Sequence, residues 1–243
     1  MTRTAPNPCV STGGAGRASI PSAAVPPSDA DFFEVVHTQR AARSFLPDDV
    51  DDETVARILT AATHAPSAEN SQPFVFIVVR DPGLRATIGG LTARIWQGGA
   101  RALEEQRLSP AFLRDVDHGA MGGIAAAPVL VVVCGDTRLT YPQSMDASIF
   151  PAVQNLLLAA HALGLGSTLT TMPVLAGEEL SGPLGLPPEV VPVAVVPLGH
   201  LPAPLGSPRR RPLSEKAHLD RYGTPFPPSA APAPPVKRSR NPQ

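Results

Sequence analysis

Two clusters of arginine side chains are the residues of this 243-residue chain best suited to bind an anion. Arg40 and Arg43 lie near the start of the chain, and Arg209, Arg210 and Arg211 are consecutive near its end. A guanidinium group donates planar, charge-assisted hydrogen bonds that match the oxygens of a phosphate dianion. On spacing alone, a solvated basic face is the favoured interpretation of either cluster, because R-x-x-R and RRR are frequent in arginine-rich sequences. The segments that lie between the clusters decide between these interpretations.

A polar loop that runs directly into an apolar segment supplies further candidates. It reads APSAENSQPF over residues 65–74. Pro66, Ser67, Asn70 and Gln72 provide hydroxyl and amide groups on a backbone that prolines restrict. Such a loop can hold a polar, planar ligand, although ordinary helix-to-strand connections of this size are common.

Several chemical classes lose support because their motifs are missing. The sequence contains no G-x-x-x-x-G-K-[ST] phosphate loop, no H-E-x-x-H, no C-x-x-C and no G-x-S-x-G. Its six histidines are scattered, and its two cysteines form neither a disulfide framework nor a metal-ligand pattern. We therefore predict no metal site and nominate no catalytic side chain. The net charge of -1 argues against nucleic-acid and anionic-membrane partners and favours small molecules.

The two ends of the chain are predicted to be disordered. Residues 1–27 and 226–243 are rich in Pro, Ala, Gly and Ser and poor in large apolar side chains, so burial cannot offset the entropy of ordering them. The leader has no continuous apolar run of the kind found in secretory signals. The most apolar long window, Ile149–Leu165, carries too many polar residues for a membrane span. We expect a cytoplasmic protein.

The first half of the chain predicts two helices and one buried strand. A helix is expected from near Ser28 to Leu46, where Pro47 ends it, and Asp51 or Asp52 is expected to cap the next helix. The unbroken apolar run Phe74–Val79 predicts a strand that is buried on both faces and carries the sheet core.

The second half predicts strands that alternate with helices. Residues 82–115 have a mixed helical composition, and glycines loosen the chain at 119–123. Ser148 is expected to cap a long helix, with Pro151 in its first turn and Gly164 at its end. The other expected elements are strands at Val129–Cys134, Leu165–Met172 and Val190–Leu198 and a short helix at Glu178–Leu184. The prolines of the last strand, Pro192 and Pro197, suggest strand margins or an edge. This alternation predicts one α/β or α+β domain.

Five segments in this order resemble the FMN-dependent nitroreductase family. They are R-x-x-R-x-F at 40–45, APSAENSQPF at 65–74, LLLAAHALGLGS at 156–167, LTTM at 169–172 and RRRPL at 209–213. The resemblance implies an α+β fold, a nitroreductase-like sheet packed with helices, in an intertwined homodimer with two FMN sites across the interface. It places one FMN domain at residues 28–225, between the two disordered ends.

The resemblance also implies the roles of the candidate residues. The phosphate of FMN would be bound by basic residues of both clusters: Arg40, Arg43, Arg209, Arg210 and Arg211. Pro66, Ser67, Asn70 and Gln72 would reach the flavin from the partner subunit, and Thr170 and Thr171 would lie beside the isoalloxazine ring. Ala41 replaces the family's usual serine, which removes one hydroxyl donor to the phosphate.

The implied function is that of an FMN-dependent oxidoreductase. Hydride would pass from NADH or NADPH through flavin N5 to a small acceptor such as a nitroaromatic, a quinone or an activated alkene. The alternative is a biosynthetic FMN-dependent dehydrogenase or oxidase that acts on a small metabolite or a peptide-derived ring. A third hypothesis, suggested by Ala41 and the disordered ends, is a flavin-binding or interaction protein without turnover. The variable region 90–123, with Trp96, Phe112 and His118, is where we expect the acceptor to be selected.

Overall fold

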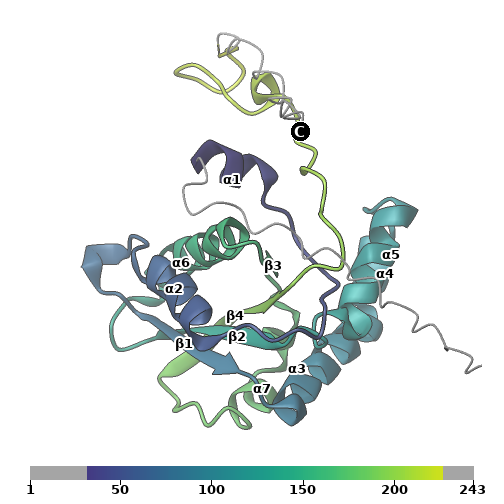
Figure 1. Ribbon diagram of the computed structural model, residues 1–243. Coiled ribbons are helices and arrows are strands. Elements are labelled where there is room, and N and C mark those ends of the chain that lie inside the picture. Colours follow the sequence, from purple (N-terminus) through teal and green to yellow (C-terminus); the bar gives the residue numbers. More distant parts are fainter. Residues whose placement is uncertain (1–31, 227–243) are drawn as a thin grey trace, which may run out of the picture.

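A four-stranded antiparallel sheet organises the computed structural model, which describes residues 32–226 (Figure 1). Its strands lie in the order β1 (Phe74–Val79), β2 (Val129–Asp136), β4 (Val190–Gly199) and β3 (Gly166–Ser167). Helices pack on this sheet, so the predicted α+β class is confirmed. The expected leader at 1–27 and all but the first residue of the expected tail at 226–243 lie outside the described residues.

Seven α-helices and several shorter helical turns occur within residues 32–226. The α-helices are α1 (Phe32–Thr38), α2 (Asp52–Thr63), α3 (Pro82–Ile95), α4 (Arg101–Glu105), α5 (Pro110–His118), α6 (Pro142–Ala162) and α7 (Glu178–Ser181). The turns are the π-helical η2 (Trp96–Ala100) and η3 (Gly119–Gly123) and the 3-10 helices η1 (Ala68–Asn70), η4 (Met172–Ala176) and η5 (Leu213–Glu215). No helix of the described chain combines the length and the apolar character needed to cross a bilayer.

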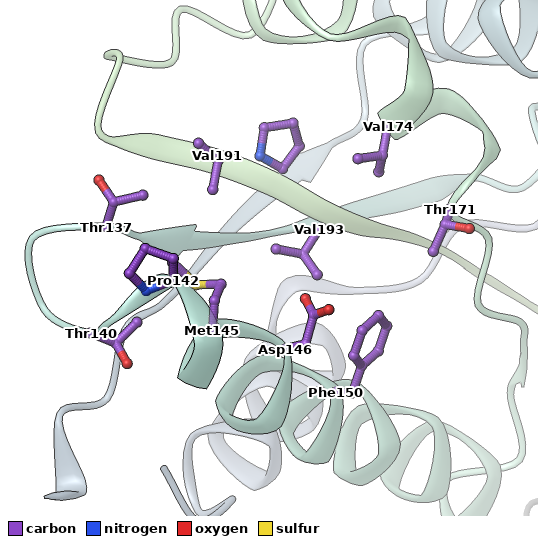
Figure 2. A pocket seen from close by; sticks show the side chains of 11 residues that line it. Thr137, Thr140, Pro142, Met145, Asp146, Phe150, Thr171, Val174, Val191 and Val193 are labelled. Atoms are coloured by element: carbon purple, nitrogen blue, oxygen red, sulfur yellow. The ribbon is translucent and has the colours of Figure 1, made fainter. Parts of the chain in front are cut away.

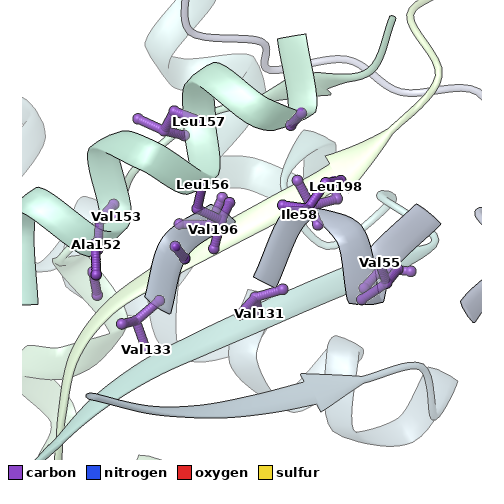
Figure 3. Close-up of a cluster of buried hydrophobic side chains, with 14 of the residues drawn as sticks. Val55, Ile58, Val131, Val133, Ala152, Val153, Leu156, Leu157, Val196 and Leu198 are labelled. Carbon is purple, nitrogen blue, oxygen red and sulfur yellow. The ribbon is translucent and has the colours of Figure 1, made fainter. Parts of the chain in front are cut away.

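The core lies on both faces of β2 and β4. Alternate residues of β2 point to opposite faces, because successive side chains of a strand alternate. Val131 and Val133 meet α2 and α6 on one face, in the cluster drawn in Figure 3. Leu130 and Val132 pack on the other face with residues of α3 and α7. β2 is buried along its whole length, whereas β1 lies at the edge and is only partly buried. The prediction that β1 carries the sheet core was therefore wrong.

The prolines of β4 suggested either strand margins or an edge position, and the edge position is wrong because β4 lies between β2 and β3. Val195 exchanges two backbone hydrogen bonds of 2.9 Å with Thr170, on the side away from β2. Pro197, two residues further, directs its missing N–H to that same side and costs no bond to β2. Pro192 lies opposite Cys134 where the register shifts. The expected strand at 165–172 is reduced to β3 and the Thr170 bridge.

The first helix ends much earlier than expected. α1 stops at Thr38, and residues 40–46 are extended. Ala41 forms a parallel bridge with Ser167, and the N–H of Ala42 donates to the carbonyl oxygen of Ser167 at 2.9 Å. Tertiary pairing with β3 has overridden the local helical propensity. The expected start near Ser28 lies outside the described residues.

Helix α6 begins six residues before the predicted cap. Pro142 occupies its first turn, where a missing N–H is tolerated, and Pro151 lies inside the helix. Ser148 is buried within it, and its Oγ donates to the carbonyl oxygen of Ser144 at 2.9 Å. The same Oγ accepts from the N–H of Ala68 at 3.1 Å. The residue predicted as a cap thus anchors the loop that precedes β1.

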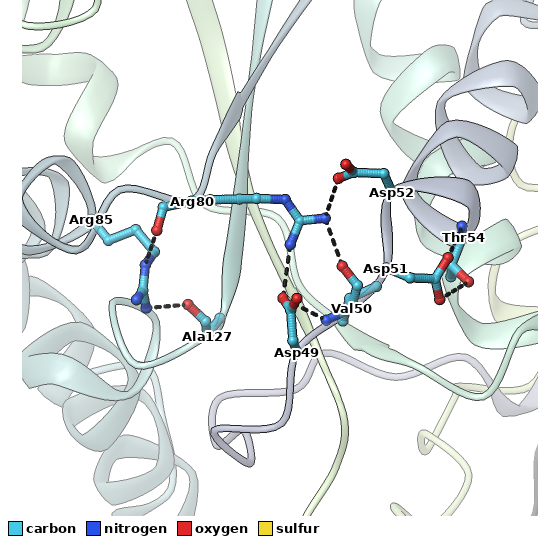
Figure 4. A network of polar contacts seen from close by, with 8 residues as sticks. All are labelled: Asp49, Val50, Asp51, Asp52, Thr54, Arg80, Arg85 and Ala127. Carbon is cyan, nitrogen blue, oxygen red and sulfur yellow. Dashed lines mark hydrogen bonds and ion pairs between the residues drawn. The ribbon is translucent and has the colours of Figure 1, made fainter.

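Polar contacts fix β1 against the start of α2 (Figure 4). Asp51, one of the two predicted caps, accepts from the N–H of Thr54 at 2.7 Å, and this hydrogen bond lowers the pKa of Asp51. Arg80, just after β1, donates to Asp49 and Asp52 at 2.8 Å each. These contacts hold the start of α2 against the C-terminal end of β1.

Candidate functional site

The two arginines of the first cluster point to different parts of the molecule. In extended backbone, side chains alternate between opposite sides, so residues three apart diverge. Arg40 is exposed, and its Nη1 donates to the carbonyl oxygen of Gly206 at 3.3 Å. Arg43 donates from Nη1 to Oδ2 of Asp115 at 2.8 Å, and its guanidinium carbon lies 5.2 Å from the centre of the Phe112 ring. The helix expected here would have placed both arginines on one face.

Arg43 packs closely against η3. Its side chain is only 17% exposed. A Cβ added at Gly119 would lie 2.9 Å from Cδ of Arg43, and one added at Gly123 would overlap the carbonyl oxygen of Arg43. The two glycines therefore make room for this arginine, and the contact joins η3 and α5 to the extended segment 40–46.

The second arginine cluster lies on an exposed C-terminal arm, residues 200–226. The arm leaves the end of β4 and runs away from the sheet, past α1 (Figure 1). Arg209, Arg210 and Arg211 are all exposed, and Arg211 lies 3.9 Å from Glu215. Arg209 follows Gly206 by three residues, so the hydrogen bond from Arg40 joins the first cluster to this arm.

The polar loop is strained but well supported. Glu69, Asn70 and Gln72 have φ values of 49°, 56° and 48°, in the left-handed region that non-glycine residues rarely adopt. Ser67 Oγ accepts from the N–H of Gln72 at 3.0 Å. The side chain of Ser71 ends in a buried hydroxyl without a hydrogen-bond partner. Strain of this kind persists only where the surroundings over-determine the backbone, and it gathers at functional sites.

The loop leaves its predicted binding residues accessible. Pro66, Asn70 and Gln72 are exposed, and Ser67 is partly exposed. Within residues 32–226, no hydrogen bond or ion pair joins these residues to either arginine cluster. One described chain therefore does not bring the loop and the arginines together.

The predicted threonines lie at a cavity of about 460 Å³ (Figure 2). Thr170 is buried, and Thr171 lines the cavity. Its other lining residues come from α6, the β2–α6 connection, η4 and the start of β4: Thr137, Thr140, Pro142, Met145, Asp146, Phe150, Val174, Val191, Pro192 and Val193. The volume lies in the range that small-molecule sites occupy.

Sequence reasoning missed the contribution of α6 to this cavity. The predicted helix began at Ser148, so Asp146 was assigned to no element. Pro142 was the available signal, because proline is over-represented in the first turn of helices.

The region expected to select the acceptor forms a small core of its own. Trp96 packs with Leu113 and Ala120 and does not line the cavity. Its Nε1 donates to Asp117 at 2.8 Å, and Arg101 donates to the same carboxylate at 2.9 Å. Hydrogen bonds from Arg101 and Trp96 lower the pKa of Asp117. The network stabilises η2 and α4 against α5.

Neither a metal cluster nor a reactive thiol stands out in the described chain. Within residues 32–226, no three His, Cys, Asp or Glu side chains are grouped to hold a metal ion. Burial raises the pKa of the free thiol of Cys134 to about 12, so Cys134 remains protonated.

Comparison with known proteins identifies the family. The Nitroreductase family model matches residues 36–200. A provisionally assigned NADH dehydrogenase/NAD(P)H nitroreductase of Methanothermobacter thermautotrophicus is 32% identical over 80% of this chain and 90% of its own length. The 5,6-dimethylbenzimidazole synthase of Rhodospirillum rubrum is 34% identical over 66% of this chain and 77% of its own.

A solved structure supports the same assignment. A provisionally assigned nitroreductase of Desulfovibrio desulfuricans, in complex with FMN, aligns with a TM-score of 0.61 and 29% identity. The alignment covers 81% of this chain and 98% of that one. The match to the family model, the two sequence relatives and this shared fold agree, and the chain belongs to the nitroreductase family.

Proposed function

We propose that this chain is an FMN-dependent oxidoreductase that takes hydride from NADH or NADPH and passes it to a small acceptor such as a nitroaromatic, a quinone or an activated alkene. The observation that carries the proposal is the FMN held by the Desulfovibrio desulfuricans protein, which shares the fold at 29% identity. The name of the Methanothermobacter thermautotrophicus relative supports NAD(P)H as the donor.

The donor set at the first arginine cluster fits the phosphate of FMN. Arg40 is exposed, and its hydrogen bond to Gly206 is long, so its guanidinium can turn to an anion. The arm carries Arg209, Arg210 and Arg211 three to five residues beyond Gly206. Ser167, paired with Ala41, has a buried Oγ without a hydrogen-bond partner. Such an orphaned hydroxyl suits a ligand oxygen.

Arg43 completes the proposed phosphate set, with Asp115 as a competing anion. Only Nη1 of Arg43 is hydrogen-bonded among the described residues, so Nε and Nη2 remain available as donors. A phosphate dianion carries more charge than the carboxylate of Asp115. Arg43 could therefore bind the phosphate through Nε and Nη2 while Nη1 stays hydrogen-bonded to Asp115.

The remaining candidates would hold the isoalloxazine ring. Thr170 and Thr171 follow β3, which contains Ser167. Thr170 pairs with Val195 of β4, and Thr171 lines the cavity. FMN, when bound, supplies the hydride chemistry at its ring. The protein's part is then to bind and orient the cofactor and to exclude water.

We propose that a second copy of the chain completes the site. Pro66, Ser67, Asn70 and Gln72 are accessible, and within residues 32–226 they form no hydrogen bond or ion pair with either arginine cluster. The arm exposes several large apolar side chains, which favours a protein partner: Leu205, Leu213, Leu219, Tyr222 and Phe226. Light scattering should give a homodimer, and a monomer that binds FMN stoichiometrically would contradict this.

A shortened chain spanning 28–223 should keep its flavin.

Anaerobic spectrophotometry tests the reaction. Addition of NADH or NADPH to the flavin-loaded protein should bleach the flavin absorbance promptly, and a nitroaromatic or quinone should restore it. Absence of bleaching with both nucleotides would contradict the reductase proposal.

The second candidate is a biosynthetic FMN-dependent dehydrogenase or oxidase that acts on a small metabolite or a peptide-derived ring. The observation that favours it is the 34% identity to 5,6-dimethylbenzimidazole synthase. Flavin that is retained, resists both nucleotides and is reduced by a metabolite would support this candidate.

A further inference from the structure

One carboxylate lies among the apolar walls of the cavity beside Thr171. Asp146 projects from the second turn of α6 toward Val193, and Phe150, one helical turn later, lies next to it (Figure 2). Valine, methionine and proline side chains form most of the remaining wall. The cavity therefore combines a ring-sized apolar space with one negative charge.

The polar neighbours of Asp146 leave this charge without a counter-ion. Asp146 forms no ion pair or hydrogen bond within residues 32–226. Arg138, from the same β2–α6 connection, is held by Asp136 at 2.6 Å and by Glu189 at 3.4 Å. Thr137 uses its hydroxyl to donate to the carbonyl oxygen of Glu189.

A second polar atom of the cavity also lacks a partner. Thr140 lines the cavity, and its Oγ1 is buried without a hydrogen bond. A hydroxyl can donate or accept, so it can serve a ligand that also satisfies Asp146. The buried hydroxyl of Thr140 has no hydrogen-bond partner, and the exposed carboxylate of Asp146 has no counter-ion. Beside an aromatic ring, the two groups favour a ligand that brings N–H donors and positive charge.

We propose that this cavity binds small aromatic compounds that carry an ammonium or amidinium group, with Asp146 as the residue that recognises the cation. The aromatic ring lies against Phe150 and the valines of β4, and the cationic group meets the carboxylate. The proposal rests on the proposed function only where it identifies these compounds as acceptors, because Thr171 joins the cavity to the proposed flavin site.

Binding of a matched pair of unreactive probes tests the recognition. Benzylamine and benzyl alcohol have nearly the same size and differ in charge at neutral pH. Calorimetry on the full-length protein as purified should show benzylamine binding about tenfold more tightly, since an accessible charge-assisted hydrogen bond contributes at the low end of its range. Equal binding of the two probes would overturn the proposal.

Two variants test whether Asp146 causes the preference for benzylamine over benzyl alcohol. Asp146→Asn keeps the shape of the side chain and removes its charge, so the tenfold preference should vanish. Asp48→Asn makes the same change at an exposed position outside the cavity, and the preference should persist. A preference that survives in Asp146→Asn would place the cation elsewhere and overturn the assignment. Far-UV circular dichroism establishes that both variants are folded.

Turnover separates this proposal from the reductase proposal. The ratio of kcat/KM for 4-nitrobenzylamine to that for 4-nitrobenzyl alcohol should exceed one and fall in Asp146→Asn. A binding preference without any turnover would support the cation site and contradict the proposed function. Turnover without a binding preference would support the proposed function and overturn the cation site.

Discussion

Arg40 and Arg43 belong to one short sequence pattern, yet they lie in opposite surroundings. Arg40 is exposed and holds the C-terminal arm by a single long hydrogen bond to Gly206. Arg43 is enclosed by η3 and α5 and paired with Asp115. A shared pattern therefore specifies residue types, whereas the extended backbone of 40–46 decides what each side chain can meet.

The difference separates a role in ligand binding alone, for Arg40, from a role in both ligand binding and packing, for Arg43. The open side of Arg40 can accept a phosphate at little structural cost. The enclosed side of Arg43 already contributes to the association of α5 with the sheet, so changes there act on stability first. Replacements on the two sides should consequently affect different measurements.

A larger side chain at Gly123, where η3 packs against Arg43, should give the largest effect on stability. Gly123→Ala would place a methyl group against the carbonyl oxygen of Arg43, and backbone cannot move aside as a side chain can. We expect a loss of about 3 kcal/mol in the free energy of unfolding, at the upper end for overpacking, measured by urea titration. Gly98→Ala, in η2, meets no atom within 4 Å and is the control. Equal stability of the two variants would show that the packing of Arg43 does not need a glycine at position 123.

Removal of each arginine should distinguish their roles through ligand affinity. Arg40→Ala should weaken FMN binding about 10- to 100-fold, the value of one charge-assisted hydrogen bond, and leave riboflavin binding nearly unchanged because riboflavin lacks the phosphate. Arg43→Ala should also weaken FMN more than riboflavin. Fluorescence titration measures both ligands. Equal losses for FMN and riboflavin in Arg43→Ala would show that its role is packing alone.

Asp115→Asn should weaken the packing of Arg43 and reduce the free energy of unfolding by a smaller amount than Gly123→Ala. The Asp115 side chain is 47% exposed, so solvent screens the ion pair and the expected loss is about 1 kcal/mol. Hydrogen exchange should accelerate in α5 and η3 and stay unchanged in β2. Acceleration throughout the chain would indicate general destabilisation. Asp48→Asn, which removes an exposed carboxylate elsewhere, should change neither region.

The interior of the fold was the part that sequence could predict. The unbroken apolar runs identified β1 and β2, and helical spacing with an aspartate cap identified α2. These signals are local, because burial and capping depend on neighbouring residues. The order of the strands depends on contacts between distant segments, so the central position of β4 and the edge position of β1 could not be read from composition.

The candidate site was less predictable for the same reason. Residue types and motif order indicated the arginines, the polar loop and the threonines. The bridge from Ala41 to Ser167 then replaced the expected helix with extended backbone and turned Arg43 away from Arg40. Asp146 carried no motif, and only the true start of α6 at Pro142 brings it to the cavity.

The smallest expected effect concerns the anchor of α1, two residues before Arg40. Thr38 donates its hydroxyl hydrogen to the carbonyl oxygen of Glu34 at 2.6 Å, so Nε2 of His161 must donate to Thr38 across their 2.8 Å contact. Burial of His161 lowers its pKa below the ordinary value of 6.5, only partly opposed by the charge of Glu34. The neutral ring is therefore the form that stabilises the fold.

The sign of the resulting pH dependence follows from linkage. The contribution of His161 is complete above about pH 6.5 and is lost as the pH falls through the lowered pKa, because protonation then favours the unfolded chain. His161→Gln can still donate to Thr38 but cannot titrate. The free energy of unfolding should consequently decline less between pH 7.5 and pH 5.5 in this variant than in the parent, measured by urea titration at each pH. If the free energy of unfolding declines equally in the parent and the variant, His161 has the same pKa in the folded and unfolded chains. The anchoring of α1 by His161 would then not depend on pH.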